Sequence, residues 1–179
     1  LVEALPAAEP TDAVGPGDLG PFMIPELDAH LLVFVDGHYR ADLSDRGAAG
    51  VSTLAEAAQA GDPALDHLNT QADTDTDAFD ALNTAMAEDG VVVRVEADAE
   101  LDKPVHVLSV ATVDEVMTAP RNLIVAGRGA KATVIEHYVA LADGAYFTNA
   151  LTEIVADAGA VVHHYLLERE SEQATNIST

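Results

Sequence analysis

Two short stretches of this sequence carry the side chains best suited to bind a metal ion, Glu136-His137-Tyr138 and His163-His164-Tyr165. Imidazole and carboxylate groups hold Zn²⁺ or Fe²⁺ when about three of them converge on one point. Successive side chains of a strand point to opposite faces, so at most one histidine of each stretch can share a face with a given partner. Whether the stretches form a site therefore depends on how their strands align.

Two alignments of these strands are open. An offset of 30 residues places His163 beside Thr133 and Glu136 beside Leu166. An offset of 27 residues instead places Glu136 beside His163 and His137 beside His164. This alignment gives a ladder of two histidines and one carboxylate. Because polar ladders are common on the outside of stacked strands, we favour a structural role. We predict no metal ligand, no catalytic residue and no cofactor-binding residue.

Other polar motifs favour structural roles as well. The acidic run Asp73–Asp77 lacks the glycine and the glutamate of an EF-hand loop and suits the capping of a helix. Gly127 and Gly129 fit neither common glycine motif for phosphate binding. Ser109 and Ser171 lie outside any nucleophile-elbow motif, so no hydrolytic triad is predicted.

Arginine and asparagine side chains are expected to pair within the strand-rich part of the chain. We expect Arg121 and Arg128 to form ion pairs with Glu115 or Asp143 rather than to contact phosphate. Stacked amide ladders are expected at turns from two residues, Asn122 and Asn149.

Charge and composition exclude several classes of function. The 31 Asp and Glu residues outnumber the 8 Lys and Arg residues, giving a formal net charge of −23. Such a surface repels nucleic-acid phosphate and anionic membranes. The chain has no cysteine, which excludes disulfides and thiolate chemistry. We expect a cytoplasmic protein, with the acidity serving either solubility or a salt-rich host. Because the sequence begins without Met and ends inside a strand pattern, we expect it to be a fragment.

Composition divides the chain into three predicted regions. Residues 1–28 form an extended arm rich in proline and acidic residues. Residues 29–90 form an N-terminal hairpin and short helices. Residues 91–179 alternate strand-length apolar runs with turns, and no segment between them is long enough for a helical crossover.

The middle region carries explicit turn and capping signals. Asp36-Gly37 predicts a hairpin over His30–Arg40. Helical segments are predicted over Val51–Asp62, Asp62–Gln71 and Asp73–Gly90. The first should be capped by Ser52 or Thr53 and end at Gly61, and the last should be capped by Asp75 or Thr76. The expected apolar face of the last helix consists of Phe79, Leu82 and Met86.

A repeat selects the architecture of the strand-rich region. The segments Ile124–Ala130 and Ile154–Ala160 match without a gap at an offset of 30 residues. Such a unit cannot bury its apolar face alone and stacks on its neighbours. The period accommodates two strands and two turns, with the small residues at the turns. We therefore predict the first rungs of a parallel β-helix over residues 91–179, rather than an antiparallel meander.

Four ordered blocks resemble the SufB/SufD family, the scaffold subunits of the SUF iron–sulfur cluster assembly system, and SufD in particular. They are Leu31–Asp45, Asp80–Val95, Pro120–Val139 and Tyr146–Ser171. The resemblance implies a right-handed parallel β-helix core (SufBD-core-like) behind a small α/β N-terminal region. It also implies a non-catalytic subunit that acts with a SufB-like paralogue and a SufC-like ATPase, while the complex assembles the cluster.

The resemblance does not supply site residues. The family's cluster-site histidine and its SufC-binding segment are expected beyond the matching residues, so none is assigned here. Two other functions stay open: a carbohydrate-active β-helix enzyme with paired carboxylates, and a purely structural acidic solenoid. Scarce aromatic residues, at 4%, and acids placed mostly in turns favour the scaffold over the enzyme.

Overall fold

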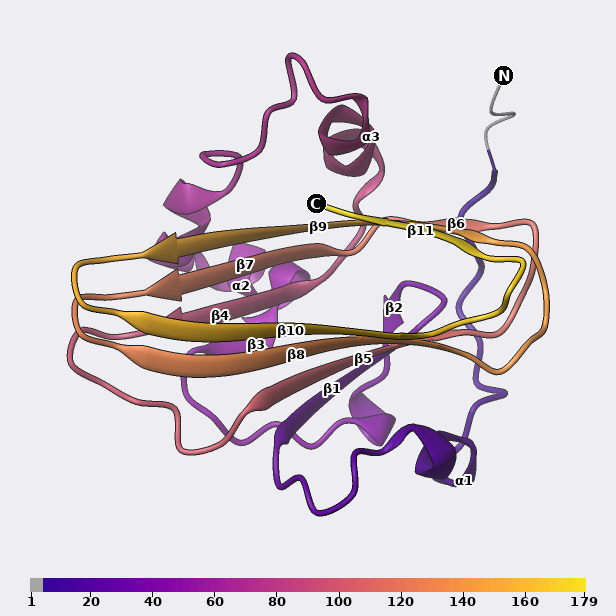
Figure 1. Cartoon of the computed structure of the whole chain (residues 1–179), viewed down its shortest axis with the longest axis horizontal. Helices are drawn as coiled ribbons and strands as arrows, with labels where there is room; N and C mark the ends of the chain where they lie inside the picture. The colour runs from indigo at the N-terminus through magenta and orange to yellow at the C-terminus, as the bar shows by residue number, and fades with distance from the viewer. Residues whose placement is uncertain (1–4) are drawn as a thin grey trace.

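A computed structural model describes residues 5–179 and shows a mainly β protein with a few short helices (Figure 1). One sheet has the strand order β10-β8-β5-β1-β2, and the other has the order β11-β9-β7-β4-β3, with β6 paired to β9. The strands are β1 His30–Val35, β2 His38–Tyr39, β3 Val51–Thr53, β4 Val91–Val95, β5 Val105–Ala111, β6 Met117–Thr118, β7 Arg121–Ala126, β8 Lys131–Ala140, β9 Phe147–Ala156, β10 Val161–Arg169 and β11 Thr175–Ser178.

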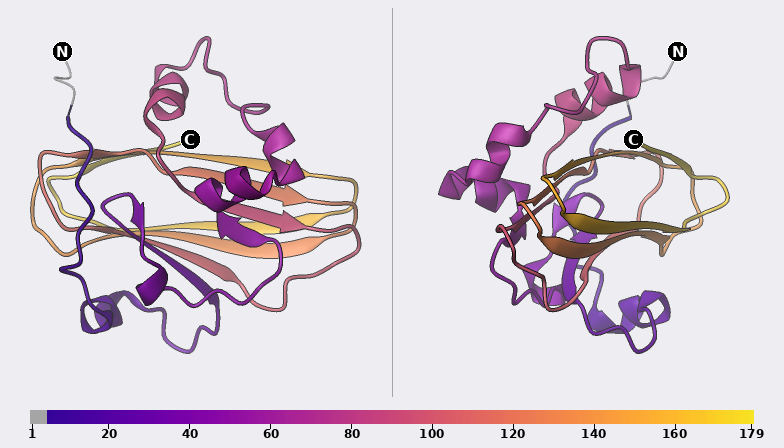
Figure 2. Two further views of the ribbon diagram at one scale, coloured as in Figure 1. Left: turned by 180° about the vertical axis from the view of Figure 1, so that it is seen from behind. Right: turned by 60° about the vertical axis from the view of Figure 1, so that its left-hand side comes forward.

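The helices are short and lie outside the sheets (Figure 2). The α-helices are α1 Pro16–Leu19, α2 Leu54–Ala60 and α3 Ala78–Met86. Three 3₁₀ turns accompany them: η1 Gly20–Phe22, η2 Ala41–Leu43 and η3 Pro63–His67.

Successive strands from β7 to β11 alternate between the two sheets, and each pairs in parallel with the strand two places along the chain. Ile124 lies opposite Ile154, which confirms the offset of 30 residues for the repeat. By contrast, β2 and β3 run antiparallel to their neighbours. The sheets are therefore mixed and not closed; the mainly β class is confirmed, whereas the parallel β-helix is not.

The repeated turns explain the small residues of the repeat. Gly129 and Gly159 have φ values of 69° and 74°, in the left-handed region that favours glycine. A Cβ atom at Gly129 would also lie 2.7 Å from Oδ1 of Asp98. The same glycine therefore returns at the same place in successive turns.

The hairpin and the first helical segment follow the predicted signals closely. β1 and β2 pair as an antiparallel hairpin around Asp36 and Gly37. The second element starts differently, because Val51–Thr53 is strand β3 and the helix begins only at Leu54. Thr53 caps α2 in a reciprocal capping box with Glu56, and Gly61 ends it with φ of 64°.

The helix predicted over Asp73–Gly90 is shorter and packs differently. α3 is capped by Asp77, not by Asp75 or Thr76, and it ends at Met86 well before Gly90. Its expected apolar face is wrong, because Phe79 and Met86 are 40% and 41% exposed. The buried residues of α3 are polar instead, namely Asp80 and Asn83.

The polar face of α3 is buried because the helix packs against backbone carbonyl groups just before β7 and within β9. The side-chain amide of Asn83, which is fully buried, donates to the carbonyl oxygens of Pro120 and Asn149 at 2.9 and 2.7 Å. Backbone carbonyl groups at a buried contact favour a hydrogen-bond donor, so an amide and not an apolar side chain fills this contact.

The main core lies between the sheets and is built from Val, Ala, Ile and Leu with Phe34. A second cluster forms on the outer face of the β10-β8-β5-β1-β2 sheet, where Val14 and Leu19 pack on residues including Val33 and Val139. A third forms where Ala57 and Ala64 cover the outer face of the other sheet. The N-terminal arm and the helices thus each cover one sheet.

Candidate functional site between the two sheets

A buried carboxylate, Glu136, lies at the centre of the polar cluster between the sheets. Glu136 and Tyr138 point inward from alternate positions of β8, and each is 2% exposed. The Tyr138 hydroxyl donates to Oε2 of Glu136 at 2.7 Å. Thr152 of β9, in the facing sheet, donates to Oε1 at 2.5 Å. The carboxylate therefore joins the two sheets.

The histidine of this cluster is His164, on the edge strand β10. Its Nε2 lies 2.8 Å from Oε1 of Glu136. Backbone pairing puts Glu136 opposite Leu166 and His163 opposite Thr133, which is the 30-residue alignment. Glu136 reaches His164 diagonally, two residues along the partner strand. The 27-residue alignment, with Glu136 beside His163, is wrong.

Hydrogen bonding decides the titration of this cluster. Burial alone would raise the pKa of Glu136, but the hydrogen bonds from His164, Thr152 and Tyr138 lower that pKa below its usual value. The hydrogen bond to Glu136 raises the pKa of His164, against the opposing effect of burial. Burial and the neighbouring carboxylate raise the pKa of Tyr138 well above 10. The structure thus favours an ionised carboxylate beside a protonated imidazole.

The neighbouring histidine, His137, points to the opposite face of β8 and does not join this cluster. Its Nδ1 lies 3.2 Å from Nε2 of His106, and the two rings stack with centroids 5.5 Å apart. Burial, followed by the influence of His137, lowers the pKa of His106 to about 4. Nε2 of His137 is buried without a hydrogen-bond partner. Alternation along the strand separates Glu136 from His137 as predicted.

The cluster can hold protons, but its ligand set for a metal is small. It offers one carboxylate and one imidazole, with two hydroxyl groups already donating to the carboxylate. Within residues 5–179, no group of three or more His, Cys, Asp or Glu side chains is arranged to hold a metal ion. Tyr165, the last member of the second stretch, is exposed on the surface of β10.

A second buried carboxylate, Glu153 of β9, was missed by the sequence analysis. Arg121 of β7 donates to it at 2.5 Å, where Glu115 or Asp143 had been expected as the partner. The backbone N–H groups of Asn69 and Gln71 donate to Glu153 at 2.8 Å each. The loop before α3 is thereby attached to the outer face of the sheet.

The other expected pairs are also different in the structure. Arg128 pairs with Asp98 rather than with Glu115 or Asp143. Asn122 and Asn149 do not stack, since the Asn122 amide contacts Thr152 and the Asn149 amide donates to the carbonyl of Phe79. The 30-residue offset itself contains the missing signal, because it sets Arg121 opposite Leu151 and Glu153 two residues further along the same face.

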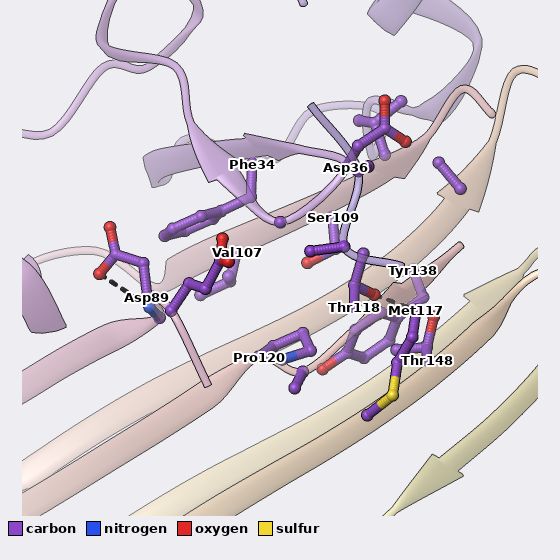
Figure 3. Close-up of a pocket in the computed structure, with 18 of the residues that line it drawn as sticks. Phe34, Asp36, Asp89, Val107, Ser109, Met117, Thr118, Pro120, Tyr138 and Thr148 are labelled. Carbon is purple, nitrogen blue, oxygen red and sulfur yellow. Dashed lines mark hydrogen bonds between the residues drawn. The ribbon is translucent and has the colours of Figure 1, made fainter. Parts of the chain in front are cut away.

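A small cavity lies between the sheets beside Tyr138 (Figure 3). Its volume is about 50 Å³, which is enough for a few water molecules. Figure 3 shows Phe34, Val107, Ser109 and Met117 around it. Its lining includes the carboxylates of four residues and no Lys, Arg or His; the four are Asp36, Glu88, Asp89 and Glu170. Burial raises the pKa of Asp89.

Comparison with known proteins gives matches along most of the chain. Residues 21–107 match the family described as SufBD protein N-terminal region, and residues 108–179 match SUF system FeS cluster assembly, SufBD core domain. The chain is similar to the iron-sulfur cluster assembly SufBD family protein slr0076 of Synechocystis, with 30% identity over 173 residues, 88% of this chain and 38% of the relative.

A second similarity is to the iron-sulfur cluster assembly protein SufD of Escherichia coli. The identity is 31% over 151 residues, covering 81% of this chain and 34% of the relative. The chain thus spans just over a third of the length of these relatives. No helix within residues 5–179 is long and apolar enough to cross a membrane.

Proposed function

Since the chain belongs to the SufBD family of SUF iron–sulfur cluster assembly proteins, we propose that it is a SufD-like scaffold subunit without catalytic activity of its own. It acts with a SufB-like paralogue and a SufC-like ATPase in the cytoplasm. Iron and sulfide are the cargo of that complex, and the chain has no resident cofactor.

The observation that carries this proposal is the order of the two family matches. They meet at residues 107 and 108 and together run from 21 to 179. The similarity to a protein named SufD supports the SufD branch. These matches favour a scaffold over a carbohydrate-active enzyme or a purely structural solenoid.

For the fold, we propose that β4 to β11 are rungs of a right-handed parallel β-helix. Alternation between two sheets, parallel pairing and the 30-residue offset support this. We expect NMR to detect short distances between backbone protons of residues near Ile124 and Ile154, as parallel pairing of β7 and β9 requires. An antiparallel pairing of these strands in solution would contradict it.

We propose that the SufB-like paralogue adds a strand beside β10. Within residues 5–179 this nine-residue strand lies at one end of its sheet, and the edge of a strand readily pairs with another strand. Four of its apolar residues are exposed by between 38% and 53%: Val161, Tyr165, Leu166 and Leu167. In β10 the charge of Glu168 is offset by Arg169, although the whole chain has a formal charge of −23. A partner strand meets little repulsion there.

Co-purification tests the proposed function. The chain, tagged at its N-terminus, is mixed in moderate salt with a SufB-like protein, with a SufC-like ATPase, or with both, and full-length SufD of Escherichia coli serves as the positive control. We expect the SufB-like protein to retain the chain, and the ATPase alone not to retain it. Loss of the chain from every sample, while the control is retained, would contradict the proposal.

A further inference from the structure

The N-terminal segment of residues 5–13 closes one side of the cavity between the sheets. Ala7 and Ala8 belong to the cavity lining. Ala7 pairs in parallel with Met117, whose backbone N–H donates to the carbonyl of Pro6 at 3.0 Å. Met117 itself lines the cavity and is only 8% exposed. The segment therefore lies between this methionine and the solvent.

Side chains of the β1–β2 hairpin region hold the segment through its backbone. Nε2 of His38 donates to the carbonyl of Ala8 at 2.7 Å. Nη1 of Arg40 donates to the carbonyl of Thr11 at 2.8 Å, while Asp42 fixes the guanidinium with contacts of 2.8 and 2.7 Å. These contacts recognise main-chain carbonyl groups, so they hold an extended segment without burying its side chains.

Burial changes sharply at the end of this segment. Within residues 5–13 only Ala8 is buried. Immediately afterwards, Val14 and Leu19 are buried in the cluster on the outer face of the sheet. Segments with few buried apolar contacts open at low free-energy cost, while well-packed elements stay closed. Residues 5–13 can thus detach as a unit, with Val14 as the fixed point.

We propose that residues 5–13 form a gate over the cavity, latched by His38 and Arg40. Opening breaks a few hydrogen bonds to the segment and uncovers Met117 and the cavity behind it. The β-sheets and the packed part of the arm stay in place. This inference is independent of the proposed role in cluster assembly.

Oxidation of methionine by dilute hydrogen peroxide measures this opening in the intact chain. The sequence has three methionines, and mass spectrometry of peptides reports each one separately. Met23 is 39% exposed and lies outside the cavity lining, so it serves as the internal reference, whereas Met86 belongs to the lining. We expect Met117 to react at least roughly tenfold more slowly than Met23, because it reacts only through the open state.

Two variants test the latch. His38→Ala and Arg40→Gln each remove a hydrogen bond to the segment and should speed oxidation of Met117 by roughly 2- to 12-fold, the range expected for one such bond. The rate of Met23, which lies outside the cavity lining, should not change. His163→Ala, on the exposed face of β10, is the matched control and should leave all three rates unchanged.

Low concentrations of urea separate local from global opening. A local gate predicts a Met117 rate that is insensitive to urea well below the unfolding transition. The proposal is overturned if Met117 reacts as fast as Met23 in the unmodified chain. It is also overturned if neither variant changes the Met117 rate, or if the change follows global stability and rises with urea.

Discussion

Glu153 of β9 and Glu136 of β8 are buried carboxylates in the two facing sheets, and different groups stabilise each of them. Each carboxylate is 2% exposed. Glu153 is held by the guanidinium of Arg121 and by backbone N–H groups of the loop before α3. Glu136 is held by side chains alone, one of them the imidazole of His164. A guanidinium stays charged at any relevant pH, whereas an imidazole does not. One cluster is therefore permanent and the other responds to pH.

The strongest test of the permanent cluster is Arg121→Met. Removing the cation leaves Glu153 buried beside a thioether, and breaking a buried pair in this way costs about 3–5 kcal/mol of unfolding free energy. Urea denaturation measures the loss. Arg128→Met is the control, because its pair with Asp98 is exposed on both sides and should be worth less than about 1 kcal/mol. Equal losses of unfolding free energy for the two substitutions would contradict the stronger stabilisation that we assign to the Arg121–Glu153 pair.

The cluster around Glu136 should respond to loss of its acceptor. Glu136→Val leaves the Tyr138 and Thr152 hydroxyl groups without their acceptor, at a cost of about 2–4 kcal/mol. Adding Tyr138→Phe removes one stranded hydroxyl and should restore about 1 kcal/mol, measured in the same urea experiment. If the double variant is less stable than Glu136→Val alone, Tyr138 does not act through Glu136.

The smallest expected effect is the dependence of this cluster on pH. Because the folded-state pKa of His164 is raised above 6.5, its stabilising effect is complete below pH 6.5 and disappears as the pH rises through the folded-state pKa. The stability difference between the unmodified chain and His164→Gln should therefore shrink from about 1 kcal/mol near pH 6 toward zero in alkali.

His163→Gln is the matched control for that titration, since its side chain lies on the opposite face of β10. We expect this variant to be about as stable as the unmodified chain, because its side chain does not contact Glu136. The Arg121→Met penalty should not shrink toward alkali in this way, because a guanidinium keeps its charge and the pKa of Glu153 is lowered. A constant His164→Gln difference would show that the pair carries no pH-dependent charge.

The local signals and the repeat made much of the fold predictable. Asp36-Gly37 indicated the hairpin, Thr53 and Gly61 indicated the ends of α2, and the repeat at Ile124 and Ile154 indicated the strand alignment. Each of these depends on residues close in sequence or on an exact period.

The side-chain pairs were harder to predict because they join residues that are diagonal across strands. Glu136 with His164 and Arg121 with Glu153 both require the alignment and the face to be known together. The packing of α3 was also missed, because Asn83 is buried against the carbonyl groups of Pro120 and Asn149, and these leave no pattern in the helix sequence.

The most direct test of the scaffold function compares two exposed aromatic residues in the co-purification with the SufB-like protein. Tyr165→Lys changes the edge strand β10, and Phe79→Lys changes α3, outside the sheets; the two side chains are 53% and 40% exposed. We expect Tyr165→Lys to abolish retention and Phe79→Lys to preserve it, with both variants as stable as the unmodified chain. Full retention of Tyr165→Lys would show that β10 is not the partner's docking strand.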